Sequence, residues 1–75
     1  MIFVTNNNVM GKNIRYHRCR MGLSRCALAE LTGMREWQIM DLEENYTRQI
    51  PGDALEKLCE VFHTSVGMIV ENRYI

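Results

Sequence analysis

The chain has 75 residues, with nine basic and nine acidic side chains and a formal net charge of zero. A chain this short forms one small domain, and 47% hydrophobic residues with a single proline are typical of a globular protein rather than a disordered tail. Its longest apolar runs, at residues 2–4 and 65–70, are far below the roughly 20 residues of a membrane span, and no basic segment precedes the first. We therefore expect a soluble, unexported protein with no membrane partner.

The three cysteines, Cys19, Cys26 and Cys59, are an odd number without a Cys-x-x-Cys pair, which favours a reducing cytoplasm. His17 and His63 are not joined to them by the spacing of metal ligands, so we expect no metal and no cofactor. His17 is predicted to be packed in the core.

Periodicity predicts an all-α fold with five short helices, preceded by residues 1–8 as an N-terminal arm and followed by residues 71–75 as a tail. Residues 1–5 are predicted to form a short strand or an arm. The first helix, about 9–21, places His17, Arg18 and Met21 on one face together with Ile14, and Gly22 ends it. Residues 45–50 are predicted to form a polar loop. The other predicted helices span about 24–31, with Ser24 as N-cap, 35–44, 51–62 and 66–70, with Ser65 as cap.

The second and third predicted helices have the spacing of two helices that cross steeply through a short turn. Ala29 is small enough to let the two helices approach, and Gly33 allows the turn between them. Ile39 and Leu42 would pack the second helix against the rest of the protein. This pattern is typical of a helix-turn-helix, whose second helix can lie in the major groove of DNA. A plain helical hairpin is the alternative.

Residues 11–70 resemble the phage-repressor, Cro-like helix-turn-helix family, also called the xenobiotic-response-element family. The motifs that carry the resemblance are Gly11-Lys12-Asn13-Ile14-Arg15, Gly22-Leu23-Ser24, Leu28-Ala29-Glu30-Leu31-Thr32-Gly33-Met34, Ile39, Leu42-Glu43, Ile50-Pro51, residues 55–62, Ser65-Val66 and Ile69. The resemblance implies a five-helix domain that binds double-stranded DNA. It also implies an ion pair between Arg18, late in helix 1, and Glu43, at the end of helix 3.

Carried over by position, the resemblance implies a set of side chains that read bases from the start of helix 2 and the exposed face of helix 3. This set is Arg25, Glu36, Trp37 and Asp41, with Gln38 nearby. A second set would bind phosphates: Ser24, Arg35, Tyr46, Thr47 and Arg48.

The charges of helix 3 depart from the family pattern, because Glu36, Asp41 and Glu44 would face a polyanion. Residues 1–35 carry six basic groups against one acidic group, and residues 36–75 carry three against eight, so the two parts have net charges of +5 and −5. Trp37 has two further interpretations, a partly buried side chain that covers the surface of helix 3 and the centre of a protein interface. The alternative to a DNA-binding regulator is therefore a protein-interaction module on the same fold.

No cluster of nucleophile, base and orienting group is visible, so an enzyme with a small-molecule substrate is not expected. A regulator of this size should act as a homodimer, because two half-sites multiply the few contacts of one module. The first candidates for the dimer surface are Met68, Ile69, Tyr74 and Ile75, and the second candidate is the arm at Ile2-Phe3-Val4.

Overall fold

The computed structural model describes residues 2–4 and 9–70 of the chain. Five helices and two short strands follow one another in these residues: β1 (Ile2–Val4), α1 (Val9–Arg20), α2 (Arg25–Thr32), α3 (Glu36–Glu43), β2 (Gln49–Pro51), α4 (Gly52–Phe62) and α5 (Val66–Val70). The predicted all-α architecture with five helices is confirmed, with a small two-stranded sheet added to it.

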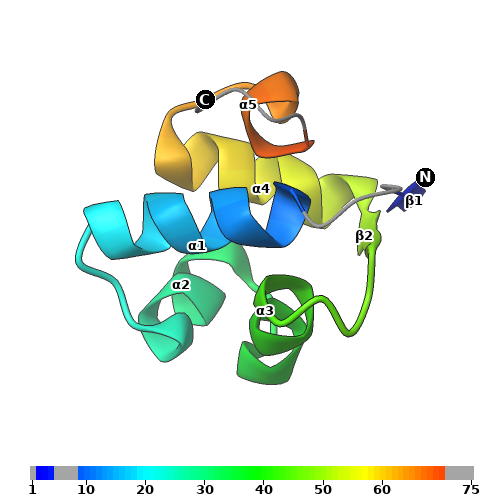
Figure 1. Ribbon diagram of the computed structural model, residues 1–75. Helices are drawn as coiled ribbons and strands as arrows, with labels where there is room; N and C mark the ends of the chain where they lie inside the picture. The colour runs from blue at the N-terminus through cyan, green and yellow to red at the C-terminus, as the bar shows by residue number, and fades with distance from the viewer. Residues whose placement is uncertain (1, 5–8, 71–75) are drawn as a thin grey trace.

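Helix α1 runs through the middle of the molecule, with α2 and α3 on one side and α4 and α5 on the other (Figure 1). It packs against α3 and α5, while α2 contacts α3 and α4. In α1, the side-chain amide of Asn13 is buried and donates a hydrogen bond to the carbonyl oxygen of Ile69 at 2.8 Å. The middle helix therefore holds both sides of the domain together.

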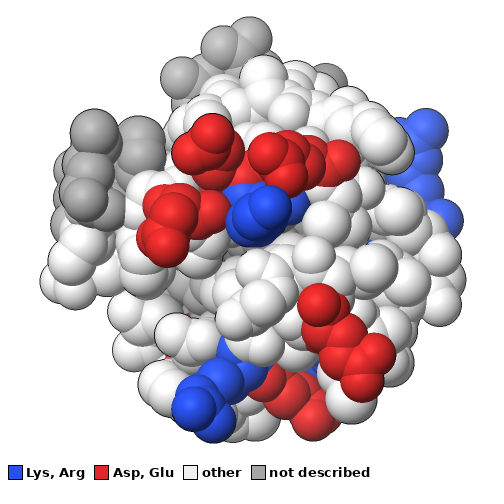
Figure 2. Space-filling model, turned by 180° about the vertical axis from the view of Figure 1, so that it is seen from behind, with Lys and Arg blue, Asp and Glu red and all other residues white. Residues whose placement is uncertain are grey.

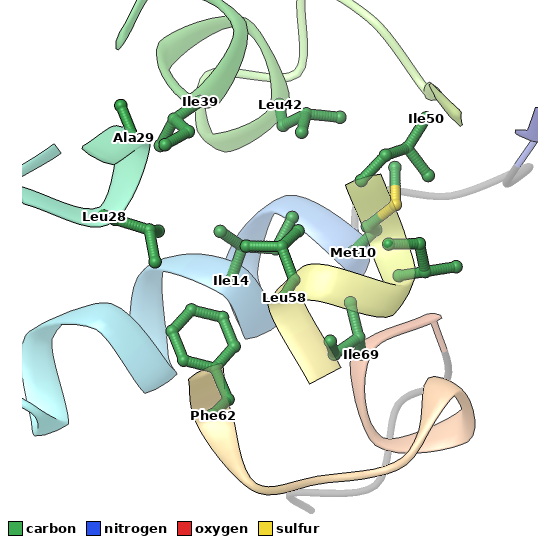
Figure 3. Close-up of a cluster of buried hydrophobic side chains, with 11 residues drawn as sticks. Met10, Ile14, Leu28, Ala29, Ile39, Leu42, Ile50, Leu58, Phe62 and Ile69 are labelled. Atoms are coloured by element: carbon green, nitrogen blue, oxygen red, sulfur yellow. The ribbon is translucent and has the colours of Figure 1, made fainter. Parts of the chain in front are cut away.

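One hydrophobic core joins all five helices and β2 (Figure 3). Its side chains come from apolar positions that repeat at helical spacing, so each helix turns one face inward. The core consists of Met10, Ile14, Leu28, Ala29, Ile39, Leu42, Ile50, Leu55, Leu58, Phe62 and Ile69. Burial of these side chains is the main stabilising term, at about 1.5–3 kcal/mol for each large one.

The helix ends follow the expected local chemistry. Ser24 caps α2, since its hydroxyl oxygen accepts a hydrogen bond from the backbone N–H of Ala27 at 3.0 Å. Gly22 and Gly33, after α1 and α2, both have positive φ, as the predicted turns require. Asn45, just after α3, also lies in the left-handed region, which asparagine tolerates better than most residues.

The structure corrects the sequence-based expectations at three places. Residues 49–51, within and beside the expected polar loop, form β2, which pairs antiparallel with β1 so that Ile50 lies opposite Phe3. Met21 is exposed rather than on the inner face, because α1 ends at Arg20 and the chain turns at Gly22. Ile69 is fully buried within the monomer, so it is not available for a dimer surface.

Candidate nucleic-acid interface

The turn between α2 and α3 has the geometry that the sequence predicted. Gly33 has a φ of 73°, and a side chain there would strain the backbone. Ala29 is buried where the two helices meet, and Ile39 and Leu42 insert into the core beneath α3 (Figure 3). One face of α3 is therefore fixed against the protein, and its other face is left outside.

The outer face of α3 is accessible. Trp37 is 57% exposed, Glu36 is exposed, and Met40 lies one turn further on at the same surface. Asp41 is half-buried. More than half of Trp37 is therefore accessible to a ligand.

Gln38, one of the candidate base-reading residues, caps the N-terminus of α3. Its side-chain oxygen accepts a hydrogen bond from the backbone N–H of Arg35 at 2.8 Å, at the N-terminus of α3. Arg35 is the N-cap residue and Gln38 is the third residue of the helix, which is the spacing of a capping box. This hydrogen bond uses one of the two lone pairs of the Gln38 side-chain oxygen, so Gln38 can contact a base only in the orientation that the cap allows.

The expected contact between Arg18 and Glu43 is present and bidentate. Nε of Arg18 donates to one carboxylate oxygen of Glu43 at 2.6 Å, and an Nη donates to the other at 2.9 Å. The Glu43 side chain is fully buried, and its hydrogen bond raises the pKa of Arg18, with burial acting in the opposite direction. Arg18 also donates to the carbonyl oxygen of Leu23, so one guanidinium links α1, the α1–α2 loop and α3.

Arg25 also pairs with Glu43. The sequence did not indicate this second contact. Nε of Arg25 donates to Glu43 at 3.1 Å, and its Nη2 donates to Glu44 at 3.4 Å. The side chain is 28% exposed and therefore lies at the edge of the outer surface. A candidate base-reading guanidinium is thus held by the carboxylates of Glu43, the last residue of α3, and of Glu44, which follows it.

An open hollow of about 540 Å³ lies between the start of α2 and the outer face of α3. It is lined by Arg25, Arg35, Glu36, Trp37 and Met40. Three of the predicted base readers and one predicted phosphate ligand are therefore brought together. Met40 was not predicted, although it follows Glu36 and Trp37 by four and three residues and so shares their side of the helix.

The other candidate phosphate ligands lie around this surface. The hydroxyl oxygen of Ser24 accepts the capping hydrogen bond of α2, and its hydrogen can still be donated to an anion. Tyr46 is 75% exposed, and Arg48 is exposed as well. Thr47 is half-buried, and its hydroxyl oxygen accepts a hydrogen bond from the backbone N–H of Gln49.

A second hollow, of about 270 Å³, lies on the other side of Trp37, between α3 and the sheet. Its apolar walls come from Ile2, Met34, Ile50 and Pro51. Asp41 and Thr47 supply polar groups to the same hollow. Trp37 thus stands between two depressions, one beside α2 and one beside β2.

Acidic side chains are prominent away from the basic first part of the chain. In the view from behind, they gather around a basic side chain in the upper half of the molecule (Figure 2). Helix α4 exposes Asp53, Glu56 and Glu60, and Lys57 forms an ion pair with Glu60 at 3.4 Å. A polyanion would be repelled by this surface and would have to approach from elsewhere.

Residues 2–4 and 9–70 contain no group of three or more side chains suited to hold a metal ion. Within the same residues, no helix has both the length and the apolar character needed to cross a bilayer. The pKa of the Cys59 thiol is raised by burial and by nearby Glu56, which disfavours the reactive thiolate.

No protein-family model matches the sequence, and a search of curated proteins found no match either. Solved structures do match. The N-terminal DNA-binding domain of SinR from Bacillus subtilis has a TM-score of 0.85 and 25% sequence identity, covering 92% of this chain and 100% of that domain. SinR in complex with DNA has a TM-score of 0.78 and 27% identity, covering 83% and 98% of the two chains.

The P22 c2 repressor in complex with a synthetic operator has a TM-score of 0.78 and 24% identity, covering 84% of this chain and 94% of the repressor. The chain therefore has the fold of the phage-repressor class of helix-turn-helix domains. The resemblance to phage-repressor helix-turn-helix domains that the sequence indicated is confirmed in the fold.

Proposed function

We propose that the protein is a sequence-specific DNA-binding regulator of transcription, of the phage or mobile-element repressor type, that places α3 in the major groove. The observation that carries the proposal is that the outer face of α3, which follows the turn at Gly33, is accessible, with Trp37 57% exposed on it. Its structural neighbours include a DNA-binding domain and two complexes with DNA. No step of this function requires a cofactor or a catalytic group.

The proposed roles follow from position and chemistry. Glu36 accepts a hydrogen bond from cytosine N4, Trp37 packs against a thymine methyl group, and Arg25 contacts guanine. Gln38 and Asp41 lie beside these readers at the edge of the contact. Phosphates are bound by the remaining candidates, Ser24, Arg35, Tyr46, Thr47 and Arg48. Few basic side chains contribute to phosphate binding. The logarithm of the affinity should therefore fall with the logarithm of the salt concentration along a shallow slope.

Selection of bound duplexes from a random pool tests the proposal. Binding to mixed genomic fragments at low and moderate salt comes first and asks whether DNA is a ligand at all. We expect the selection to converge on one short motif. Binding without any preferred sequence would contradict sequence-specific recognition.

We further propose that the regulator is a homodimer, which would read two half-sites about one helical turn apart. Ile2 at the exposed edge of the sheet and half-buried Met68 on α5 are candidate contacts, and the two predicted contacts in the tail, Tyr74 and Ile75, lie outside the described residues. Sedimentation of the full chain should give a dimer. Replacing Ile2 by Asp, or ending the chain at residue 71, should shift it toward monomer if the respective surface is the contact.

The second candidate function is binding of a protein. The apolar hollow between α3 and the sheet favours it, because Trp37 and Ile2 are exposed there next to the carboxylate of Asp41. A partner segment with basic and apolar side chains would complement that surface. Absence of DNA binding in both assays would support this function over the first.

A further inference from the structure

Arg25 contacts the end of α3 through two carboxylates, one of which Arg18 already pairs. Glu43 is fully buried, and both of its carboxylate oxygens already accept hydrogen bonds from Arg18. The additional bond from Nε of Arg25, at 3.1 Å, goes to an oxygen that Arg18 also contacts. Without Arg25, Glu43 would still be paired, so Arg25 is available for another task.

The second contact of Arg25 lies nearer to solvent. Its Nη2 donates to Glu44 at 3.4 Å, and the Glu44 side chain is 42% exposed. Exposed ion pairs of this kind are weak and are easily exchanged for another anion. Arg25 also lines the hollow beside Trp37, so the exchange would take place at the proposed DNA surface.

The two carboxylates together occupy one side of the guanidinium. The Nε–H and the neighbouring N–H of Nη2 point the same way and form one of the two donor forks that arginine can offer. In the structure, Nε contacts Glu43 and Nη2 contacts Glu44. This fork is therefore directed at the end of α3, and a bidentate contact with guanine or phosphate through it requires Nε to leave Glu43 and Nη2 to leave Glu44.

We propose that Glu44 is an affinity-setting residue that competes with DNA for the guanidinium of Arg25. This inference rests on the proposed DNA-binding function and adds a specific restraint to it. Glu44 lowers affinity in two ways, because it repels the phosphate backbone as any carboxylate does and because it holds Arg25. Only the second effect depends on Arg25, so the two can be separated.

A double-mutant cycle with Glu44→Gln and Arg25→Gln tests the proposal, with the dissociation constant for duplex DNA as the measurement. We expect Glu44→Gln to increase affinity by about two- to fivefold in the wild-type background, the range of one exposed ion pair. In the Arg25→Gln background the gain should shrink toward that of a repulsion-only control. Glu30→Gln, an exposed carboxylate of α2, is that control.

The outcomes separate this inference from the function on which it rests. An equal gain from Glu44→Gln with and without Arg25 would overturn the proposal while leaving DNA binding intact. Failure of the wild type and of every variant to bind duplex DNA at low salt would overturn both. Thermal melts should confirm that all variants are folded, since the contact between Arg18 and Glu43 is retained in each.

Discussion

At the scale of single residues, Glu43 is the side chain on which the position of α3 depends most. It is buried completely and accepts hydrogen bonds from two arginines of two other helices. A buried carboxylate is tolerated only when it is paired in this way, because its desolvation is not otherwise offset. Arg18 therefore has a structural role, whereas Arg25, which is more exposed, can also serve the surface.

Replacing Arg18 by Met should lower the free energy of unfolding by roughly 3–5 kcal/mol, because Glu43 would lose its main partner. Urea denaturation measures this change. Arg15→Met is the matched control, since Arg15 is an exposed residue of the same helix, and it should change stability little. A wild-type unfolding midpoint for Arg18→Met would contradict the structural role of the pair.

His17 should make stability depend on pH. It is buried and stacks on Phe62 with ring centroids 5.1 Å apart, and burial, then the charge of Arg20, lower its pKa from 6.5. The unfolded chain therefore takes up a proton more readily than the folded one. Stability is unaffected well above pH 6.5 and falls as the pH drops through 6.5 toward the lower folded pKa.

Melting temperatures from pH 7.5 down to pH 5 check this dependence. His17→Leu should flatten the curve in that range relative to the wild type. His63→Asn is the control, because His63 is exposed and its left-handed conformation suits asparagine. A steep loss of stability that persists in His17→Leu would assign the effect to other groups.

At the scale of helices and strands, local signals in the sequence predicted more than long-range ones. The helices, the Ser24 cap and the turn at Gly33 follow from periodicity and from residue chemistry within a few positions. Strand β2 could not be found in this way, because Ile50 pairs with a residue 47 positions earlier. The capping role of Gln38 could have been found, since its spacing from Arg35 is that of a capping box.

The contacts of Arg25 were missed for the same reason as β2. Its partners, Glu43 and Glu44, are 18 and 19 residues away, and no sequence pattern selects them among the acidic residues. The pairing of Arg18 with Glu43 is equally distant, and it was predicted only because the resemblance to the family supplied it.

Helices α1 and α3 approach each other closely at Gly11. A Cβ atom at Gly11 would collide with the backbone carbonyl of Leu42, which cannot move without shifting α3. Gly11→Ala should therefore destabilise the domain by about 1–3 kcal/mol, despite the better helix propensity of alanine. Thermal unfolding measures it, with Lys12→Ala, at the adjacent exposed position, as control. Equal melting temperatures for Gly11→Ala and the wild type would contradict this packing.

At the scale of the whole molecule, the fold separates the part that maintains structure from the part offered to a ligand. The core and the Arg18–Glu43 pair fix α3, while Trp37 and Glu36 remain outside. The fold class could be predicted from the sequence, but the accessibility of each candidate side chain depends on the packing of helices that are far apart in the sequence. The acidic residues of α3 make recognition of DNA depend on a small number of favourable contacts.

Two kinds of variant should separate binding of phosphates from recognition of bases. Arg48→Ala should weaken binding to all duplexes alike and reduce the salt slope by about one, as loss of one phosphate contact does. Trp37→Ala should instead change discrimination at one base pair, at a cost of about 1–3 kcal/mol for the preferred sequence. Binding curves for the selected duplex and its point variants check both expectations. Equal loss of affinity on every sequence for Trp37→Ala would remove it from the reading surface.

Trp37 also allows the most direct test, because it is the only tryptophan of the chain and is 57% exposed. Its fluorescence reports on the outer face of α3 alone. During titration with the selected duplex, we expect the emission to change and quenching by acrylamide to decrease in proportion to the DNA bound. A duplex that binds while emission and quenching stay as in the free protein would contradict the placement of α3 in the major groove.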